Sequence, residues 1–458
     1  MASKSMTAAH TGFGWIAILR IGAVQAAIGA IVMLTTSVLN RVMVVEYGLA
    51  AAIPAGLVAW HYAVQLTRPL WGHGSDKGRA RTPWILSGFS ILVLGALMAV
   101  NATVFVNDLP VAAPILAVLA YSMIGLGVGA GGTTLLALLA SGVAEERRAP
   151  AAAVTWTMMV AGIVIAAGIS GQFLDPFSEQ RLALVASGVA GVAFLIVLLA
   201  MWGLERQSLP VAANRPSEPP PDFGEALREI LHERAARRFT AFIFVSMLAY
   251  SMQDLILEPF AGLVFDMTPG ESTGLAGIQH AGVLVGMILT GVGGSAFGGR
   301  LPSELRAWIV AGCLGSALAL VGLALAAQAG AGWPLEANVF ALGLCNGVFA
   351  VAAIGAMMGL AGAGKKTREG VRMGVWGAAQ AIAFGMGGLL GALGVDIARG
   401  AHGEDASAFQ LIFALEALAF LLAAVLAMRA TQKGLVSDKA NDEASESLRD
   451  TLGEVVEA

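Results

Sequence analysis

Two acidic residues are candidates for chemistry because both lie inside an apolar stretch of the chain. Asp254 and Glu258 are four residues apart, and Glu258 directly precedes Pro259. On a helix the two acidic residues therefore share one face. Neighbouring carboxyl groups influence each other's protonation, and such a pair could couple proton movement to a conformational change. The alternative interpretation places both residues near the aqueous end of their helix.

Two histidines form a second kind of candidate. His61 lies in the middle of an apolar stretch between Trp60 and Tyr62, and His280 follows Gln279 near the start of another. A neutral imidazole can bind a metal ion, including the magnesium of a chlorin. The alternative for each is a hydrogen bond within a helix bundle or a place near the membrane surface. Two further polar residues in apolar stretches are weaker candidates of the same kind: Asn346 and Glu416.

The elements that must position these residues read as membrane-spanning helices. The chain is 57% hydrophobic and 13% charged, about half the charged fraction of a soluble protein. It contains twelve apolar stretches near the length of about 20 residues that crosses a bilayer. We predict spans at about 15–38, 49–68, 84–106, 113–140, 152–173, 182–203, 240–264, 277–299, 307–328, 337–361, 372–395 and 407–428.

The positive charges indicate how the chain is oriented. All Lys and Arg residues except Arg41, Arg181 and Arg399 fall at the two ends of the chain or on every second connection. Cationic loops are retained in the cytoplasm during insertion. An even number of spans with both termini in the cytoplasm follows from this pattern.

The spans divide into two groups of six. Residues 205–239 form the longest internal connection and include the run PSEPPP at 216–221, which cannot be helical. Several residues recur at an offset of about 220, among them Arg148 with Arg368 and Trp156 with Trp376. We therefore predict an all-α membrane protein with the major facilitator fold of two six-helix halves. Its parts are the N-terminal half 1–204, the cytoplasmic linker 205–239, the C-terminal half 240–430 and an acidic cytoplasmic tail 431–458.

A Gly-rich basic connection follows the second span. Residues 72–81 read GHGSDKGRAR, which approximates the signature of the major facilitator superfamily, although Gly78 follows Lys77 directly where the family has one residue between. An Asp here can accept hydrogen bonds at a helix N-terminus and pair with Arg. We predict a cytoplasmic latch formed by Gly72, Asp76, Arg79 and Arg81; the alternative is a basic turn that only orients the protein.

Several segments in both halves form recognisable motifs. In the first half these are residues 39–46 (LNRVMVVE), 61–65 (HYAVQ), 68–76 and 81–84 (RTPW). In the second half they are 268–273 (TPGEST) and 368–374 (REGVRMG). Together these segments resemble the PucC/LhaA family, the bacteriochlorophyll-delivery branch of the major facilitator superfamily. The similarity spans about residues 13–430 and is stronger to the PucC branch than to the LhaA branch.

The resemblance implies a non-enzymatic assembly factor for light-harvesting complexes. Its cargo would be bacteriochlorophyll a, and its partners antenna polypeptides, bacteriochlorophyll synthase and the lipid bilayer, with no nucleic acid. It would lie in the bacterial inner membrane that carries the photosynthetic apparatus. His61, His280, Asn346 and Glu416 are then the candidate pigment ligands. Two alternatives stay open: a proton-coupled transporter of a small solute that uses Asp254 and Glu258, and a scaffold that carries no pigment.

Overall fold

The computed structural model describes residues 13–68, 71, 80–143, 148–205, 234–296, 302–362 and 369–430. Within these ranges every regular element is helical. The predicted linker (apart from its two ends) and the acidic tail lie outside the described residues, as do Gly72, Asp76 and Arg79 of the predicted latch.

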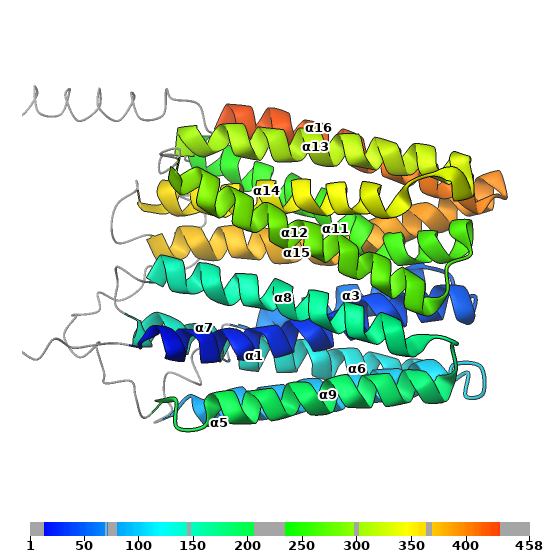
Figure 1. Cartoon of the computed structure of the whole chain (residues 1–458), viewed down its shortest axis with the longest axis horizontal. Coiled ribbons are helices and arrows are strands. Elements are labelled where there is room, and N and C mark those ends of the chain that lie inside the picture. Colours follow the sequence, from blue (N-terminus) through cyan, green and yellow to red (C-terminus); the bar gives the residue numbers. More distant parts are fainter. Residues whose placement is uncertain are drawn as a thin grey trace, which may run out of the picture.

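Six helical segments form the N-terminal half, which Figure 1 shows in blue to green. Three of them contain turns of tighter or wider helix, so that one continuous segment carries several labels. The segments are α1 (Trp15–Met33, continued by η1 Leu34–Val38, α2 Leu39–Arg41 and η2 Val42–Glu46), α3 (Ala52–Val64, continued by η3 Gln65–Thr67), α5 (Thr82–Val104), α6 (Ala112–Gly127, continued by η4 Val128–Gly132 and α7 Thr133–Gly142), α8 (Arg148–Leu174) and α9 (Glu179–Met201).

Six more segments form the C-terminal half. They are α11 (Arg234–Phe265), α12 (Pro269–Ala296), α13 (Pro302–Ala329, continued by η7 Gly330–Gly332), α14 (Leu335–Gly362), α15 (Glu369–His402) and α16 (Asp405–Ala430). Eleven of the described segments are long and apolar enough to cross a membrane, and only the α3 segment falls short of that length. The all-α membrane fold predicted from the sequence is confirmed.

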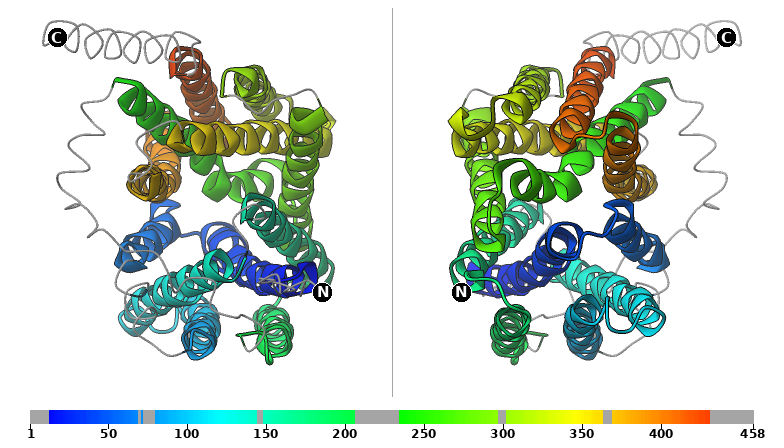
Figure 2. Two further views of the ribbon diagram at one scale, coloured as in Figure 1. Left: turned by 90° about the vertical axis from the view of Figure 1, so that its left-hand side faces the viewer. Right: turned by 90° about the vertical axis from the view of Figure 1, so that its right-hand side faces the viewer.

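The two halves meet along two helix pairs. α3 packs against α15, and α8 packs against α12, while α1 and α11 lie between these pairs. Seen along the bundle, the N-terminal half occupies one side and the C-terminal half the other (Figure 2). We call the end that holds Arg41 and the start of α12 the Arg41 end, and the end that holds Arg81 and the start of α1 the Arg81 end.

Glycines allow one helix pair to approach unusually closely. A Cβ atom added at Gly343 of α14 would lie 2.0 Å from the carbonyl oxygen of Gln279, and one at Gly286 of α12 would lie 2.2 Å from that of Leu344. Between membrane helices there is no hydrophobic driving force, so close backbone packing of this kind supplies the attraction. The α12–α14 contact therefore depends on glycine.

Candidate functional site

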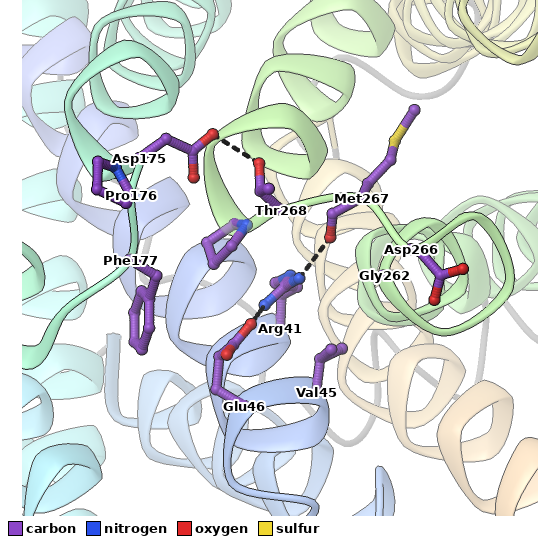
Figure 3. A pocket seen from close by; sticks show the side chains of 11 residues that line it. Arg41, Val45, Glu46, Asp175, Pro176, Phe177, Gly262, Asp266, Met267 and Thr268 are labelled. Carbon is purple, nitrogen blue, oxygen red and sulfur yellow. Dashed lines mark hydrogen bonds and ion pairs between the residues drawn. The ribbon is translucent and has the colours of Figure 1, made fainter.

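A cavity of about 570 Å³ opens between the two halves at the Arg41 end (Figure 3). It is bounded by the last turn of the α1 segment, the α8–α9 connection, the end of α11 and the start of α12. Its polar and aromatic lining residues include Arg41, Glu46, Asp175, Phe177, Asp266 and Thr268.

Arg41 joins the halves beside this cavity. Its side chain is only 2% exposed. The guanidinium group forms an ion pair with Glu46 on its own segment, and Nη2 donates a 2.7 Å hydrogen bond to the carbonyl oxygen of Met267 in the other half. A buried guanidinium is stable only when it is paired and hydrogen-bonded. Arg41 therefore stabilises the contact between the halves at this end.

A second set of contacts lies deeper along α1 and α11. Ser37 Oγ donates a hydrogen bond to Oε1 of Glu258, whose other oxygen accepts from Thr273 Oγ1 at 3.5 Å. Asn40 Nδ2 donates to the carbonyl oxygen of Leu255 at 2.7 Å. We call Ser37, Asn40, Arg41, Glu258 and Thr273 the interface cluster.

Two further carboxylates connect the halves through helix N-termini. Asp396 of α15 accepts hydrogen bonds from the backbone N–H groups of Ala51 and Ala52 at the start of α3, at 3.0 and 2.8 Å. Asp175, which follows α8, accepts from Thr268 Oγ1 at 2.6 Å and from the N–H of Gly270 at 3.1 Å. An acidic side chain at a helix N-terminus satisfies free N–H groups and interacts favourably with the helix dipole.

The predicted acidic pair shares helix α11, but its members have different neighbours. Glu258 is buried and bonded to the interface cluster. Asp254 lies within electrostatic reach of Glu416 on α16, and its Oδ1 atom is buried without a hydrogen-bond partner among the described residues. α11 continues for seven residues beyond Glu258, to Phe265, so neither residue lies in the last turn of the helix.

His61 is buried and already bonded. Arg68 Nη2 donates to Gln65 Oε1, which directs the Gln65 amide nitrogen toward His61 Nε2 at 2.7 Å. The ring nitrogen that receives this bond is therefore occupied, and the proton lies on Nδ1, which has no partner among the described residues. A metal ligand at this position would first have to lose the bond to Gln65.

His280 is partly exposed and its ring is held by one nitrogen only. Nδ1 lies 2.9 Å from the carbonyl oxygen of Ala276, and since a carbonyl only accepts, Nδ1 carries the proton and Nε2 has a free lone pair. His280 is seven residues from Thr273 on α12, so the two share a face. Thr273 contacts Glu258 of α11, and this face is therefore directed toward the interior of the bundle.

Asn346 and Glu416 are fully buried inside the C-terminal half. Asn346 Oδ1 accepts a 2.7 Å hydrogen bond from Ser316 Oγ on α13. Its Nδ2 atom and both carboxyl oxygens of Glu416 have no partner among the described residues. Among the described residues no hydrogen bond joins either side chain to His61 or His280, and the four candidate pigment ligands lie on four different helices, α3, α12, α14 and α16.

Of the predicted latch, only Arg81 falls within the described residues. Its backbone N–H and that of Thr82 donate to the carboxylate of Glu205 at 2.6 and 2.9 Å, and its guanidinium donates to the carbonyl oxygen of Ala137. Burial alone would raise the pKa of Glu205. The pKa is nevertheless held below its usual value by these backbone hydrogen bonds, by the hydrogen bond from the Thr82 hydroxyl and by the charge of Arg81. Glu205 was not predicted as a partner of this segment.

Sequence reasoning also missed Ser37, Asn40, Arg41 and Asp396 as contacts between the halves. For Arg41 a signal existed, because it is one of three basic residues outside the charge pattern. A cation inside a membrane-spanning segment is costly unless it is paired, and here the partners are Glu46 and the carbonyl oxygen of Met267.

Similar proteins identify the family. A model of the PUCC protein family matches residues 38–435. The "Bacteriochlorophyll synthase 44.5 kDa chain" of Rhodobacter capsulatus is 51% identical over 90% of this chain and 95% of its own. "Protein PucC" of the same organism is 29% identical over 91% of this chain and 92% of its own.

Solved structures show the fold. A bacterial homologue of the human lysosomal transporter Spinster, in an inward-facing and unoccupied conformation, matches with a TM-score of 0.68 at 15% identity. The match covers 91% of this chain and 96% of the homologue. The chain is thus a multi-pass membrane protein with the major facilitator fold, and by its family match over residues 38–435 it belongs to the PUCC protein family.

Proposed function

We propose that this protein binds bacteriochlorophyll a and delivers it to nascent antenna polypeptides during assembly of light-harvesting complexes. Membership in the PUCC family carries the proposal. The name of the 51% identical relative associates that protein with bacteriochlorophyll synthesis. A protein that is not itself an enzyme but receives pigment from bacteriochlorophyll synthase fits both observations.

His280 is the magnesium ligand in this proposal. Metal-binding histidines usually donate their second ring nitrogen to a carbonyl or carboxylate, which fixes the tautomer and orients the ring. The bond from Nδ1 to Ala276 does this for His280 and leaves Nε2 available. His61 ranks below it, because its acceptor nitrogen is occupied by Gln65.

The test is the pigment content of protein purified from pigmented membranes. The wild-type protein is expected to retain stoichiometric bacteriochlorophyll in its absorption spectrum. His280→Leu removes the ligand from a partly exposed site and should lower pigment per protein several-fold with unchanged protein yield. His61→Leu is the matched control, and we expect it to leave the ratio unchanged. Pigment-free wild-type protein would overturn the proposal, and loss of pigment in His61→Leu alone would reassign the ligand.

We also propose that the Arg81 end faces the cytoplasm, in the bacterial inner membrane. The charge pattern of the sequence supports this orientation. Topology reporters fused after residues 77 and 215 should give cytoplasmic signals, and one fused after residue 178 a periplasmic signal. A periplasmic signal at 215 would contradict both the orientation and the number of spans in the first half.

A proton-coupled transporter of a small solute is the second candidate. It is favoured by Glu258, a buried carboxyl group whose partner Ser37 lies in the opposite half. The protonation state of a carboxyl group placed there could change when the two halves separate. Proton-driven solute uptake by pigment-free protein in vesicles would favour this function over pigment delivery.

A further inference from the structure

Inside the C-terminal half, four helices bring together five polar side chains, four of which have atoms that lack hydrogen-bond partners among the described residues. Gln253 and Asp254 come from α11, Ser316 from α13, Asn346 from α14 and Glu416 from α16. We call these five residues the interior cluster. All except Asp254 are completely buried. Six of their side-chain atoms have no hydrogen-bond partner among the described residues: both of Gln253, both of Glu416, Oδ1 of Asp254 and Nδ2 of Asn346.

Aromatic contacts show that three of these helices meet at one level. The ring of Phe349 on α14 lies 6.2 Å from that of Tyr250 on α11 and 5.6 Å from that of Phe420 on α16. One turn toward the Arg41 end, each helix carries a member of the interior cluster. These members are Gln253 and Asp254 on α11, Asn346 on α14 and Glu416 on α16.

A second aromatic layer closes the cluster on its other side. Phe260 of α11 packs against Phe409 and Phe413 of α16, with ring centroids 5.3 and 5.0 Å apart. Gln253 is seven residues before Phe260 and therefore lies on the same face of α11, toward α16. The carboxyl groups of Asp254 and Glu416 are within electrostatic reach of each other. The polar side chains thus share one compartment between two layers of rings.

The composition of this compartment indicates its ligand. Among the described residues no Lys or Arg forms an ion pair with Asp254 or Glu416, and two uncompensated carboxylates in such a place are strongly unfavourable. One positive charge removes the conflict. A metal cation would need a shell of about six oxygen ligands. Oδ1 of Asn346 already accepts from Ser316, and a metal would leave the Nδ2 donor of Asn346 without an acceptor.

A proton satisfies the same groups. One protonated carboxyl becomes a donor to the other, and the remaining carboxyl oxygens accept from the amides of Gln253 and Asn346. We propose that Asp254 and Glu416 form a proton-binding pair that holds one proton in the interior of the C-terminal half. This site is separate from Glu258, and it does not depend on what cargo the protein carries.

Other ionisable groups around the pair are few and mostly engaged. Tyr250 on α11 and Tyr62 on α3 lie within electrostatic reach of Asp254, and Arg68 within reach of Tyr62. Glu258 is bonded to Ser37, and Cys345 lies against the α13 backbone at Gly315. Asp396 of α15 accepts a hydrogen bond from the start of α3, and Arg399 of α15 pairs with Asp405. Both contacts lie at the Arg41 end. Tyr62 therefore places one ionisable group of the opposite half within electrostatic reach of the pair.

Infrared spectroscopy of the purified full-length protein tests the proposal. A protonated carboxyl group gives a C=O stretch that is separate from carboxylate bands and shifts in heavy water. We expect such a band near neutral pH, and we expect Glu416→Gln and Asp254→Asn each to reduce it. Glu336→Gln, which changes an exposed carboxyl at the start of α14, is the control and should leave the band unchanged.

Three results would overturn the proposal. The first is wild-type protein without the band anywhere between about pH 5 and about pH 9, where a coupled buried pair should hold its proton. The second is a band that neither Glu416→Gln nor Asp254→Asn alters. The third is a band that disappears when choline chloride is replaced by sodium chloride at constant pH, since that would show a sodium site. The wild-type measurement stands even if the variants do not accumulate, and none of these results bears on pigment content.

Discussion

At the interface between the halves, Ser37, Arg41 and Glu258 are bonded to residues of the opposite half. Inside the C-terminal half, by contrast, the side chains of Gln253 and Glu416 are also buried but have no hydrogen-bond partners among the described residues. Each cluster has members on helix α11: Glu258 belongs to the interface cluster, and Gln253 and Asp254 belong to the interior cluster. Polar groups that are bonded in place hold two bodies in one arrangement. Polar groups without partners instead favour a ligand that supplies the missing charge or hydrogen bond.

Removing the guanidinium of Arg41 should have the largest effect on this comparison. Arg41→Ala leaves the carboxylate of Glu46 and the carbonyl oxygen of Met267 without their partner. Because Glu46 is exposed, we expect a loss of about 1–3 kcal/mol in stability, as for the loss of a hydrogen bond from a charged group together with the packing of its side chain, seen as a lower thermal unfolding midpoint and lower protein yield. Arg41→Ala combined with Glu46→Gln should lose less. Equal loss in the single and double variants would show that Glu46 contributes nothing.

The same substitution at two buried carboxyl groups separates the clusters directly. Glu258→Gln replaces an acceptor of the Ser37 and Thr273 hydroxyls, and it should cost about 1–2 kcal/mol. Glu416→Gln removes a charge that has no hydrogen-bond partner among the described residues, and a neutral amide there should change stability by less than about 0.5 kcal/mol. Thermal unfolding in one detergent compares the two. If Glu416→Gln is the more harmful, the distinction between the clusters is wrong.

Asp396 tests whether carboxylates at helix ends also hold the halves together. Asp396→Asn leaves one acceptor for the two N–H groups of Ala51 and Ala52, and it should cost about 1 kcal/mol. Asp405→Asn is the matched control, because Asp405 pairs with Arg399 within the same half and both side chains are about one-third exposed. The control should cost less than about 0.5 kcal/mol. Equal midpoints for the two variants would remove Asp396 from the set of contacts between the halves.

The smallest effect is expected at Glu205. Like Asp396, this carboxylate accepts hydrogen bonds from two backbone N–H groups at the start of a helix, but its site is open to water. Its pKa is held below the ordinary 4.5, so its contribution is present above the pKa of the unfolded chain and is lost as pH falls through the lower folded value. At this exposure we expect only a few tenths of a kcal/mol. Unfolding midpoints between about pH 7 and about pH 3 should fall slightly less in Glu205→Gln than in wild type. An identical decline would contradict this contribution.

The fold was largely predictable because apolar length and charge asymmetry are local properties of the chain. Eleven of the twelve expected spans meet the length and hydropathy that a membrane helix requires, and α3 fills the place of the second. The first span was predicted to end at residue 38, yet the helical segment continues to Glu46 through two π-helical turns. Asn40, Arg41 and Glu46 interrupt the apolar pattern there, and their stabilising partners Leu255 and Met267 are remote in the sequence.

The site was predictable only in its residue types. Spacing placed Asp254 and Glu258 on one helix face, but it could not reveal that Glu258 bonds to Ser37 or that Asp254 lies near Glu416. Similarly, the sequence identifies His61 and His280 as imidazoles within apolar stretches, whereas the difference between them depends on Gln65 and Ala276. Pairings between distant helices are set by the packing of the whole bundle, which a local pattern does not contain.

The glycine contact between α12 and α14 has a mechanical consequence. Backbones that touch at Gly286 and Gly343 leave no soft side chains between them to absorb displacement, so the two helices move as one stiff body. α12 packs against α8 of the opposite half, and α14 carries Asn346 directly beside Gly347, another glycine of the contact. A force that α8 exerts on α12 is therefore shared by α14, including the turn that carries Asn346.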